Sequence, residues 1–205
     1  MTRKKGMLFD LDGVLVDSEG EYSKFWGMVG ERYHLAPGFN NSIKGTTLME
    51  ILSHFPESER SGIADELHGY ERHMSFIVYP GVKEFLARLS DEGIPAVIVT
   101  SSDDEKMRCL YAQHPEIKKA VTGIVTADMV SKGKPDPECF LLGAGMIGIP
   151  IGDCYVFEDS VNGLKAARAS GATVVALTTT NPKEVVAPMA DIVVGSVEEF
   201  GRMVL

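Results

Sequence analysis

Short apolar runs that alternate with helical patterns constrain the fold of this chain most strongly. Most of the runs are rich in Val and Ile, and they occupy residues 6–9, 95–100, 123–126, 154–158, 172–177 and 191–194. Helical patterns lie at residues 82–91, 105–113, 137–147, 161–170 and 197–203. Continuous apolar strands between helices are typical of a parallel sheet that is covered on both faces. The sequence therefore predicts an α/β fold with a doubly wound parallel sheet.

Residues 16–78 interrupt this alternation of strand and helix patterns. Three helical patterns occur there, at 19–33, 47–54 and 58–76, and no convincing strand. The segment is too long for a plain connection between two elements. A Pro80-Gly81 turn signal precedes the return of the strand–helix pattern. We therefore predict a helical insert at 16–78 within a core formed by 1–15 and 79–205.

Composition and charge argue against several classes of partner. The chain has 205 residues, and no apolar stretch approaches the roughly 20 residues that span a bilayer. Its net charge of −9 argues against a nucleic-acid partner, because phosphate backbones need a basic surface. Three widely spaced cysteines argue against a disulfide framework or a zinc site. With no signal-peptide pattern at residues 1–6, we expect a cytoplasmic protein that binds neither a membrane nor nucleic acid.

Two carboxylates follow the first apolar run directly. Asp10 lies where the strand at 6–9 should end, and Asp12 lies two residues further on, in the sequence Asp-Leu-Asp-Gly. A carboxylate exposed at a strand end can attack an electrophile, and a neighbouring carboxyl group can move a proton. The alternative is a simple Asp-Gly turn. Three later strand ends also carry groups suited to phosphate chemistry, and these favour the catalytic interpretation.

Hydroxyl groups and a lysine follow two of the later strands. Thr100 and Ser101 stand just before a predicted helix, where hydroxyls and free backbone N–H groups can cradle an anion. Lys134 lies in a proline-stiffened loop and is suited to neutralising a phosphoryl group. In isolation, the simpler interpretations are favoured, namely a helix cap and a solvated loop lysine.

The acidic pair Glu158-Asp159 ends a further strand and could, alone, cap the next helix. Ligands bind beyond the carboxyl ends of parallel strands, so this pair should share one crevice with Asp10 and Asp12. Each like-charge pair at about 4 Å costs roughly 4 kcal/mol at an effective dielectric constant near 20. A divalent cation relieves that repulsion, and oxygen ligands select Mg²⁺. The five histidines fit no metal spacing and are expected at the surface, so the set predicts a phosphoryl-transfer site with Mg²⁺.

With these four motifs in order, the chain resembles the haloacid dehalogenase superfamily, specifically its small-helical-cap branch of phosphatases and β-phosphoglucomutase-like enzymes. The resemblance spans essentially the whole chain. It implies a Rossmann-like core, with the insert at 16–78 as a cap domain that closes over the site. It also implies that Asp10 is the nucleophile and forms an aspartyl-phosphate. Asp12 would be the acid that protonates the leaving oxygen, and then the base that activates water.

The same resemblance gives roles to the other motif residues. Thr100 and the Ser101 backbone would hold the phosphoryl group, and Lys134 would neutralise it. The implied ligands of Mg²⁺ are Asp10, the main-chain carbonyl of Asp12, Asp159, and Glu158 either directly or through water.

Two departures from the family pattern bear on the choice between phosphatase and mutase. β-Phosphoglucomutases carry a cap histidine that aligns with Tyr22 here, and a cap arginine that aligns with Leu48. A bisphosphate intermediate needs a second anion site, so both departures favour hydrolysis. Tyr22, Lys44, Gly45 and Thr46 are the cap residues expected to contact the substrate.

The sequence thus predicts a Mg²⁺-dependent phosphatase that acts on a small phosphorylated metabolite, most plausibly a sugar or polyol phosphate. One alternative is a hexose-phosphate mutase resembling β-phosphoglucomutase. Another is a non-catalytic regulator that binds phosphate, which is disfavoured because both Asp10 and Asp12 are present. Because a cap-and-core plan works as a single chain, we expect a monomer.

Overall fold

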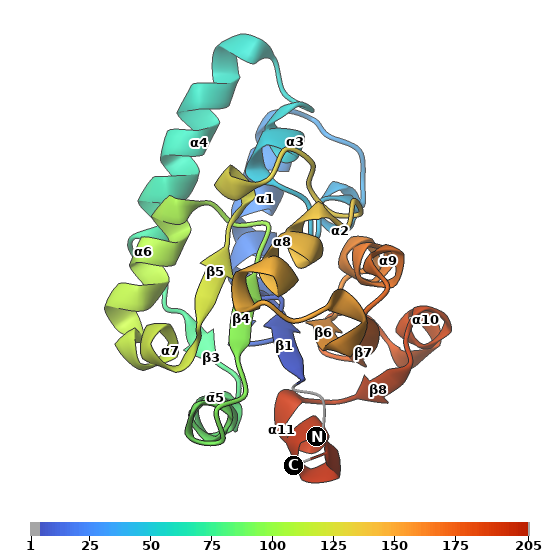
Figure 1. Ribbon diagram of the computed structural model, residues 1–205. Coiled ribbons are helices and arrows are strands. Elements are labelled where there is room, and N and C mark those ends of the chain that lie inside the picture. The colour runs from blue at the N-terminus through green and yellow to red at the C-terminus, as the bar shows by residue number, and fades with distance from the viewer. Residues whose placement is uncertain (1–4, 205) are drawn as a thin grey trace.

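A six-stranded parallel sheet forms the centre of the computed structural model, which describes residues 5–204 (Figure 1). The strands are β1 (Gly6–Phe9), β4 (Ala96–Val99), β5 (Gly123–Val125), β6 (Cys154–Glu158), β7 (Thr173–Leu177) and β8 (Ile192–Val194). Their spatial order is β5-β4-β1-β6-β7-β8, and every neighbouring pair is parallel. The chain therefore winds outwards from β1 in both directions, which confirms the predicted doubly wound, Rossmann-like fold.

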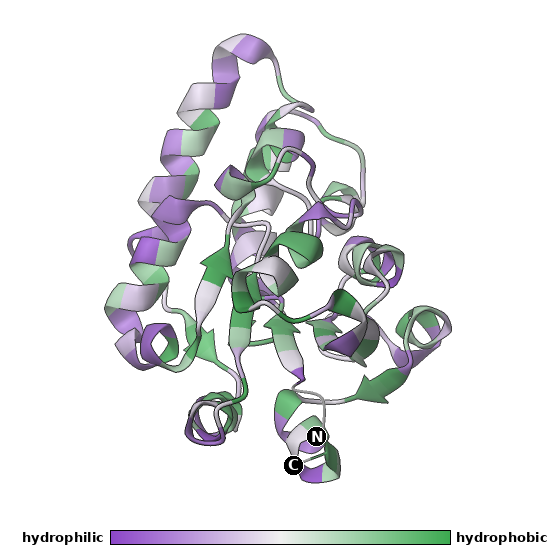
Figure 2. Ribbon diagram, viewed as in Figure 1, coloured by the Kyte–Doolittle hydropathy of each residue, from purple (hydrophilic) through white to green (hydrophobic). Residues whose placement is uncertain are grey.

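Helices cover both faces of the sheet. One face carries α5 (Val82–Asp91), α6 (Asp104–Gln113), α7 (Pro115–Ala120) and α11 (Val197–Val204), and the other carries α8 (Glu138–Ile147), α9 (Val161–Ser170) and α10 (Lys183–Val186). Met7 and Phe9 of β1 belong to the first apolar cluster and Leu8 belongs to the second, because successive strand residues point to opposite faces. The strands are accordingly mostly green in Figure 2, whereas the helices carry purple, hydrophilic residues as well.

Three short 3₁₀ helices complete the connections of the core: η1 (Ala127–Met129), η2 (Ile151–Asp153) and η3 (Ala187–Met189). Within residues 5–204, no helix is both long enough and apolar enough to cross a membrane.

The segment between β1 and α5 forms a group of helices beyond the carboxyl ends of the strands (Figure 1). We call residues 16–78 the cap segment. Its helices are α1 (Glu19–Arg32), α2 (Phe39–Ser42), α3 (Leu48–Leu52) and α4 (Glu57–Glu71). They enclose an apolar cluster of their own, in which the rings of Phe25 and Trp26 meet edge to face at 5.0 Å and Phe55 stacks on Trp26.

Two short strands join the cap segment to the core. β2 (Val16–Asp17) pairs with β3 (Ile77–Val78) in an antiparallel ribbon. The expectation that residues 16–78 contain no strand is therefore wrong. A strand of two residues is too short to show a periodic pattern in sequence.

The helix predicted at 58–76 ends at Glu71 instead. Met74 and Phe76 are buried in the apolar cluster of the core, and the backbone N–H of Phe76 donates to Oε1 of Gln113. These tertiary contacts end the helix, although the local sequence pattern continues.

Candidate active site

Asp10 and Asp12 lie in the turn that follows β1. The N–H of Asp10 donates to the carbonyl of Phe157 in β6 at 2.9 Å, which fixes Asp10 at the carboxyl edge of the sheet. The turn passes through Gly13 at φ +78°, a left-handed conformation that glycine adopts readily. A Cβ atom on Gly13 would lie 1.9 Å from Oδ2 of Asp159. The Asp-Gly turn is thus also the point where the segment of Asp10 and Asp12 closely approaches Asp159.

Lys134 is buried beside Asp10. Its Nζ donates to Oδ1 of Asp10 at 2.6 Å, to Oε1 of Glu158 at 2.7 Å and to the carbonyl of Val99 at 3.1 Å. Burial lowers the pKa of Lys134, but the two carboxylates raise it by more, so the lysine stays charged. Lys134 is therefore a fixed positive charge beneath the Asp10 carboxylate.

Hydrogen bonds from the protein occupy both oxygens of Glu158. Oε1 accepts from Lys134, and Oε2 accepts from the N–H groups of Asp159 and Ser160 and from the Ser160 hydroxyl. The start of α9 packs tightly on this carboxylate, since a Cβ atom on Gly163 would lie 1.8 Å from Oε1. Glu158 thus orients Lys134, and its part in holding a metal stays a prediction.

Three carboxylates come together in a way that fits a cation. Asp10, Glu158 and Asp159 place oxygens within 4.8 Å of one another, and Oδ1 of Asp159 is buried without a hydrogen-bond partner among residues 5–204. Burial raises the pKa of Asp10 to about 7; Lys134 opposes this, while Glu158 and Asp12 add to it. Burial also raises the pKa of Asp159, and the charges of Glu158 and Asp10 raise it further. A buried, oxygen-only donor set that is short of positive charge fits Mg²⁺.

Lys106 of α6 holds the second aspartate. Its Nζ lies 2.5 Å from Oδ2 of Asp12, which also accepts from the Ser102 hydroxyl at 3.2 Å. The Ser18 hydroxyl donates to Oδ1 of Asp12. Burial raises the pKa of Asp12, but the charge of Lys106 and these hydrogen bonds outweigh it, so the pKa falls below its ordinary value. Asp12 is therefore held as a carboxylate in this arrangement.

A cavity of about 120 Å³ lies between the cap segment and this edge of the sheet. The predicted site residues that line it are Asp10, Asp12, Thr100, Ser101 and Asp159 from the core and Tyr22, Lys44, Gly45 and Thr46 from the cap segment. Lys134 and Glu158 lie behind Asp10 rather than on the cavity wall. The fold thus brings the predicted residues from all four strand ends to one place.

Polar contacts lie along the wall of the cavity, one between the core and the cap segment and two within the cap segment. The Ser101 hydroxyl donates to the carbonyl of Gly45 at 2.9 Å. Lys44 forms an ion pair with Glu19 at 2.8 Å, and the Tyr22 hydroxyl donates to Oε1 of Glu71 at 2.6 Å. Polar groups of the cap segment therefore form part of the cavity wall.

A second, more open hollow lies at the opposite, amino edge of the sheet. Pro95, Thr122 and Asp153, which precede β4, β5 and β6, are among the residues that line it. It contains none of the predicted site residues, so the chemistry places the site at the carboxyl edge.

The motifs did not identify Lys106 or Glu71. Lys106 lies one helical turn before Leu110 on the buried face of α6, and Glu71 continues the buried stripe of Ile63 and Leu67 in α4. A charged residue in the apolar stripe of a predicted helix is the sequence signal that could have found both.

His68 and His114 are half-buried, so the expectation of surface histidines holds only in part for these two. Nε2 of His114 lies 2.6 Å from the carbonyl of Phe76. Nε2 of His68 lies 2.9 Å from Oδ2 of Asp103, because this part of α4 faces the start of α6. His68, Asp103 and Glu71 place ligand-type atoms within 4.8 Å of one another, a grouping that sequence spacing did not reveal.

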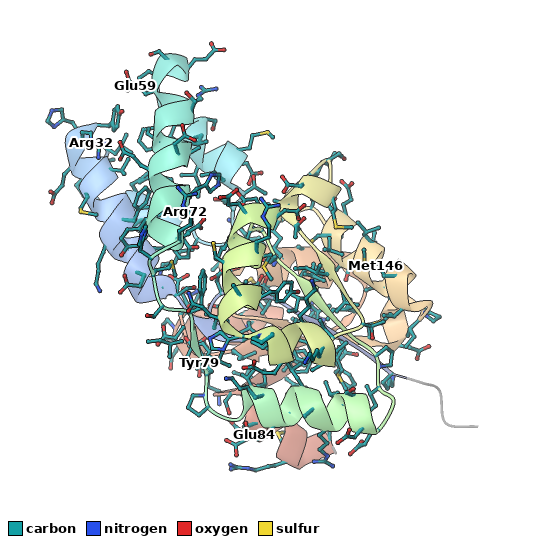
Figure 3. All side chains as sticks on the ribbon, turned by 90° about the vertical axis from the view of Figure 1, so that its left-hand side faces the viewer. Arg32, Glu59, Arg72, Tyr79, Glu84 and Met146 are labelled. Carbon is teal, nitrogen blue, oxygen red and sulfur yellow. The ribbon has the colours of Figure 1, made fainter. Side chains whose placement is uncertain are left out.

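Figure 3 shows Arg72 directly after α4, near α6. Arg72 forms an ion pair with Glu105 of α6 at 3.0 Å. Together with the pair of His68 and Asp103, this contact joins the last turn of α4 to the core.

Comparisons with known proteins agree with this geometry. The sequence pattern of the haloacid dehalogenase-like hydrolases matches residues 4–171. Hexitol phosphatase A of Escherichia coli (strain K12) is 34% identical over 189 residues, which cover 85% of this chain and 83% of that protein.

Solved structures are also similar over nearly their whole length. A hydrolase from Pseudomonas syringae superposes with a TM-score of 0.85 at 27% identity, covering 97% of both chains. The fold is shared as well with a β-phosphoglucomutase from Clostridium difficile, at a TM-score of 0.80 and 22% identity, covering 98% of this chain and 95% of that one. With the motifs, the fold and the matched pattern in agreement, this chain belongs to the haloacid dehalogenase-like hydrolases.

Proposed function

We propose that the protein is a Mg²⁺-dependent phosphatase that hydrolyses a small sugar or polyol phosphate through an aspartyl-phosphate on Asp10. The observation that carries the proposal is the presence of Asp10 and Asp12 on the wall of one cavity, with Lys134 and Oδ1 of Asp159, which no described residue hydrogen-bonds, beside Asp10. Membership of the family and similarity to a hexitol phosphatase support a phosphoric monoester as the substrate.

The two aspartates divide the reaction into two steps. A carboxylate oxygen of Asp10 attacks the phosphorus, the bond from phosphorus to the ester oxygen breaks, and Asp12 gives its proton to that oxygen. Asp12, now a carboxylate, then takes a proton from water. The water oxygen attacks the phosphorus, which releases inorganic phosphate and restores Asp10. One slow displacement is thereby replaced by two easier ones.

The surrounding residues hold the reacting groups. Lys134 fixes the Asp10 carboxylate, and Thr100 and Ser101 line the cavity where the phosphoryl group would sit. Mg²⁺ would be held by Asp10, the main-chain carbonyl of Asp12, Asp159 and, directly or through water, Glu158. Its positive charge would offset the negative charge of these acids and of the phosphoryl oxygens.

The charges on the cavity wall favour hydrolysis over a mutase reaction. Lys44 and Lys106 are the lysines on the wall, and each already contacts a carboxylate, of Glu19 and Asp12 respectively. A bisphosphate intermediate needs a free cation for its second phosphate. The wall carries Leu48 at the position that aligns with the cap arginine of the mutases.

Asp10→Asn tests the nucleophile. An amide cannot form the acyl phosphate, so Mg²⁺-dependent release of phosphate from sorbitol 6-phosphate should fall by about 10³-fold or more. The matched control is Asp91→Asn, at an exposed position of α5, which should keep the wild-type rate. Circular dichroism should show the same fold in all three proteins.

Two results would contradict the proposal. One is retention of activity by Asp10→Asn, which would remove Asp10 from the chemistry. The other is conversion of β-glucose 1-phosphate to glucose 6-phosphate without release of phosphate, in the presence of a trace of bisphosphate, which would establish the mutase instead.

A further inference from the structure

Glu71 lines the cavity and carries a hydrogen-bond acceptor that no residue described by the structure uses. It is the last residue of α4, it lines the cavity, and it is 3% exposed. Its Oε1 accepts from the Tyr22 hydroxyl, whereas its Oε2 is buried without a hydrogen-bond partner. A buried polar atom without a partner is costly, so a ligand that donates a hydrogen bond there gains free energy.

The surroundings of Glu71 strengthen such a contact. Apolar side chains of Trp26, Ile51 and Leu67 also line the cavity. They limit the access of water, and a hydrogen bond to a carboxylate is stronger in such a place than in bulk solvent. Tyr22 fixes the carboxylate from one side, so the direction of the free oxygen is set before a ligand arrives.

The charges near Glu71 define which donor fits. The ammonium group of Lys106 lies 4.3 Å from the centre of the Tyr22 ring, and its charge acts on Glu71. A second cation would be repelled by Lys106, and one of the oxygens of Asp103 is already used to cap α6. A metal at Glu71, His68 and Asp103 is therefore disfavoured, and a neutral hydroxyl group is the donor that fits.

An anionic group fits this half of the cavity poorly. Glu71 and Asp103, whose charges act on each other, contribute negative charge to the wall there, and both lysines on the wall are engaged by carboxylates. A leaving group that carried a carboxylate or a second phosphate would be buried near these acids without a free cation.

We propose that Glu71, oriented by Tyr22, accepts a hydrogen bond from a hydroxyl group of the leaving alcohol and so selects polyhydroxylated monophosphates over alkyl or acidic ones. The proposal rests on the phosphatase function given above. Loss of one charged, buried hydrogen bond corresponds to roughly 10- to 100-fold in kcat/KM. Glu71 is thus a specificity-determining residue, and it takes no part in the transfer of the phosphoryl group.

Three esters with six-carbon leaving groups test this selection: sorbitol 6-phosphate, n-hexyl phosphate, which has no hydroxyl groups, and 6-phosphogluconate, which has a carboxylate. The wild-type enzyme should prefer sorbitol 6-phosphate over each of the others by about tenfold or more in kcat/KM. Glu71→Leu should reduce the ratio of kcat/KM for sorbitol 6-phosphate to that for n-hexyl phosphate by 10- to 100-fold. Glu71→Gln keeps an amide oxygen and should recover part of the ratio.

Glu66→Gln is the matched control, since Glu66 lies on the same helix but is exposed and paired with Arg32. Its ratio of kcat/KM for sorbitol 6-phosphate to that for n-hexyl phosphate should equal the wild-type ratio. The inference is overturned if the wild type shows no preference among the esters. It is also overturned if the Glu71 variants lose kcat/KM for sorbitol 6-phosphate and for n-hexyl phosphate equally, which is what a structural role predicts. Absence of Mg²⁺-dependent hydrolysis of all three esters by the wild type would instead defeat the phosphatase proposal itself.

Discussion

Asp12 must carry a proton in one half of the proposed reaction and give it up for the other, so its immediate contacts matter as much as its presence. The Lys106 ammonium and two serine hydroxyls favour the ionised form. This suits the step in which Asp12 takes a proton from water. It also means that protonation of Asp12 before the first step depends on how strongly Lys106 holds it.

Lys106→Met should raise the pKa of Asp12, because burial then acts without the opposing charge. A group with a higher pKa keeps its proton to higher pH. The alkaline limb of the kcat/KM profile should therefore move to higher pH, because more of Asp12 keeps the proton that the first step needs, and kcat should fall roughly tenfold as the carboxylate loses its orienting partner. A pH series with sorbitol 6-phosphate measures both effects.

Lys106→Arg keeps the positive charge and should leave the limb close to its wild-type position. If the profile of Lys106→Met coincides with that of the wild type, Lys106 does not tune Asp12.

The place of a residue in the site could be predicted from sequence where the residue belongs to a motif. It could not be predicted where only the packing of the fold brings the residue to the site. Asp10, Asp12 and Lys134 follow strand ends, and a parallel sheet must bring strand ends to one edge. Lys106 lies in the first turn of α6 and Glu71 ends α4, and their closeness to the site depends on how α4 and α6 pack. No sequence spacing encodes that packing.

Among the elements, β6 and α9 show how closely the core is fitted around the site. Glu158 ends β6 and receives hydrogen bonds from the first residues before α9. The helix can approach only because residue 163 has no side chain. Packing of one helix on one carboxylate therefore controls where Lys134 points.

Two glycines in helices should respond to alanine with opposite signs. Gly163→Ala forces Glu158 away from Lys134 and should lower the free energy of unfolding by about 3 kcal/mol, because a buried charge loses its partner. Gly145→Ala in α8 meets no atom within 4 Å and should raise it by about 0.5–1 kcal/mol, since alanine is the better helix former. Urea unfolding of both variants without Mg²⁺ measures the difference.

If both substitutions raise the free energy of unfolding, Glu158 can move away from Lys134 without destabilising the protein. The prediction for Gly163 would then be wrong.

The strands of the parallel sheet were predicted from sequence more closely than the helices. The run at 154–158 coincides with β6, because a buried strand is a continuous apolar stretch with clear ends. The end of α4 was missed, since Met74 and Phe76 leave the helical path to reach the core. The short helices α2, α7 and α10 offered too few residues for a period to show.

For the molecule as a whole, the acidic site is a source of instability that a cation can remove. Asp10 and Asp159 both have raised pKa values, so the folded protein binds protons that the unfolded chain releases. Without Mg²⁺, stability should therefore fall as the pH rises from about 4, the ordinary pKa of an aspartate, through about 7, the pKa of Asp10. At low pH the same acids are neutral and do not repel one another.

Mg²⁺ should reverse this trend. Binding displaces protons, so the affinity for Mg²⁺ should rise up to about tenfold per pH unit below pH 7 for each proton released. The increase in Tm on adding Mg²⁺ should be small at pH 5 and large at pH 8, and Asp159→Asn should remove most of it. Thermal melts across this pH range, with and without Mg²⁺, provide the measurement; a Tm of the metal-free protein that climbs from pH 5 to pH 8 would contradict the prediction.

The ribbon of β2 and β3 has a consequence for how such an enzyme can change over generations. The polypeptide departs from the sheet and comes back through two paired strands, so the start and the finish of the cap segment are neighbours. A stretch whose ends are neighbours can be lengthened, shortened or exchanged while the surrounding scaffold stays intact. Mutations that alter which alcohol is accepted can therefore accumulate in one block of the gene, while the strand that presents Asp10 stays as it is.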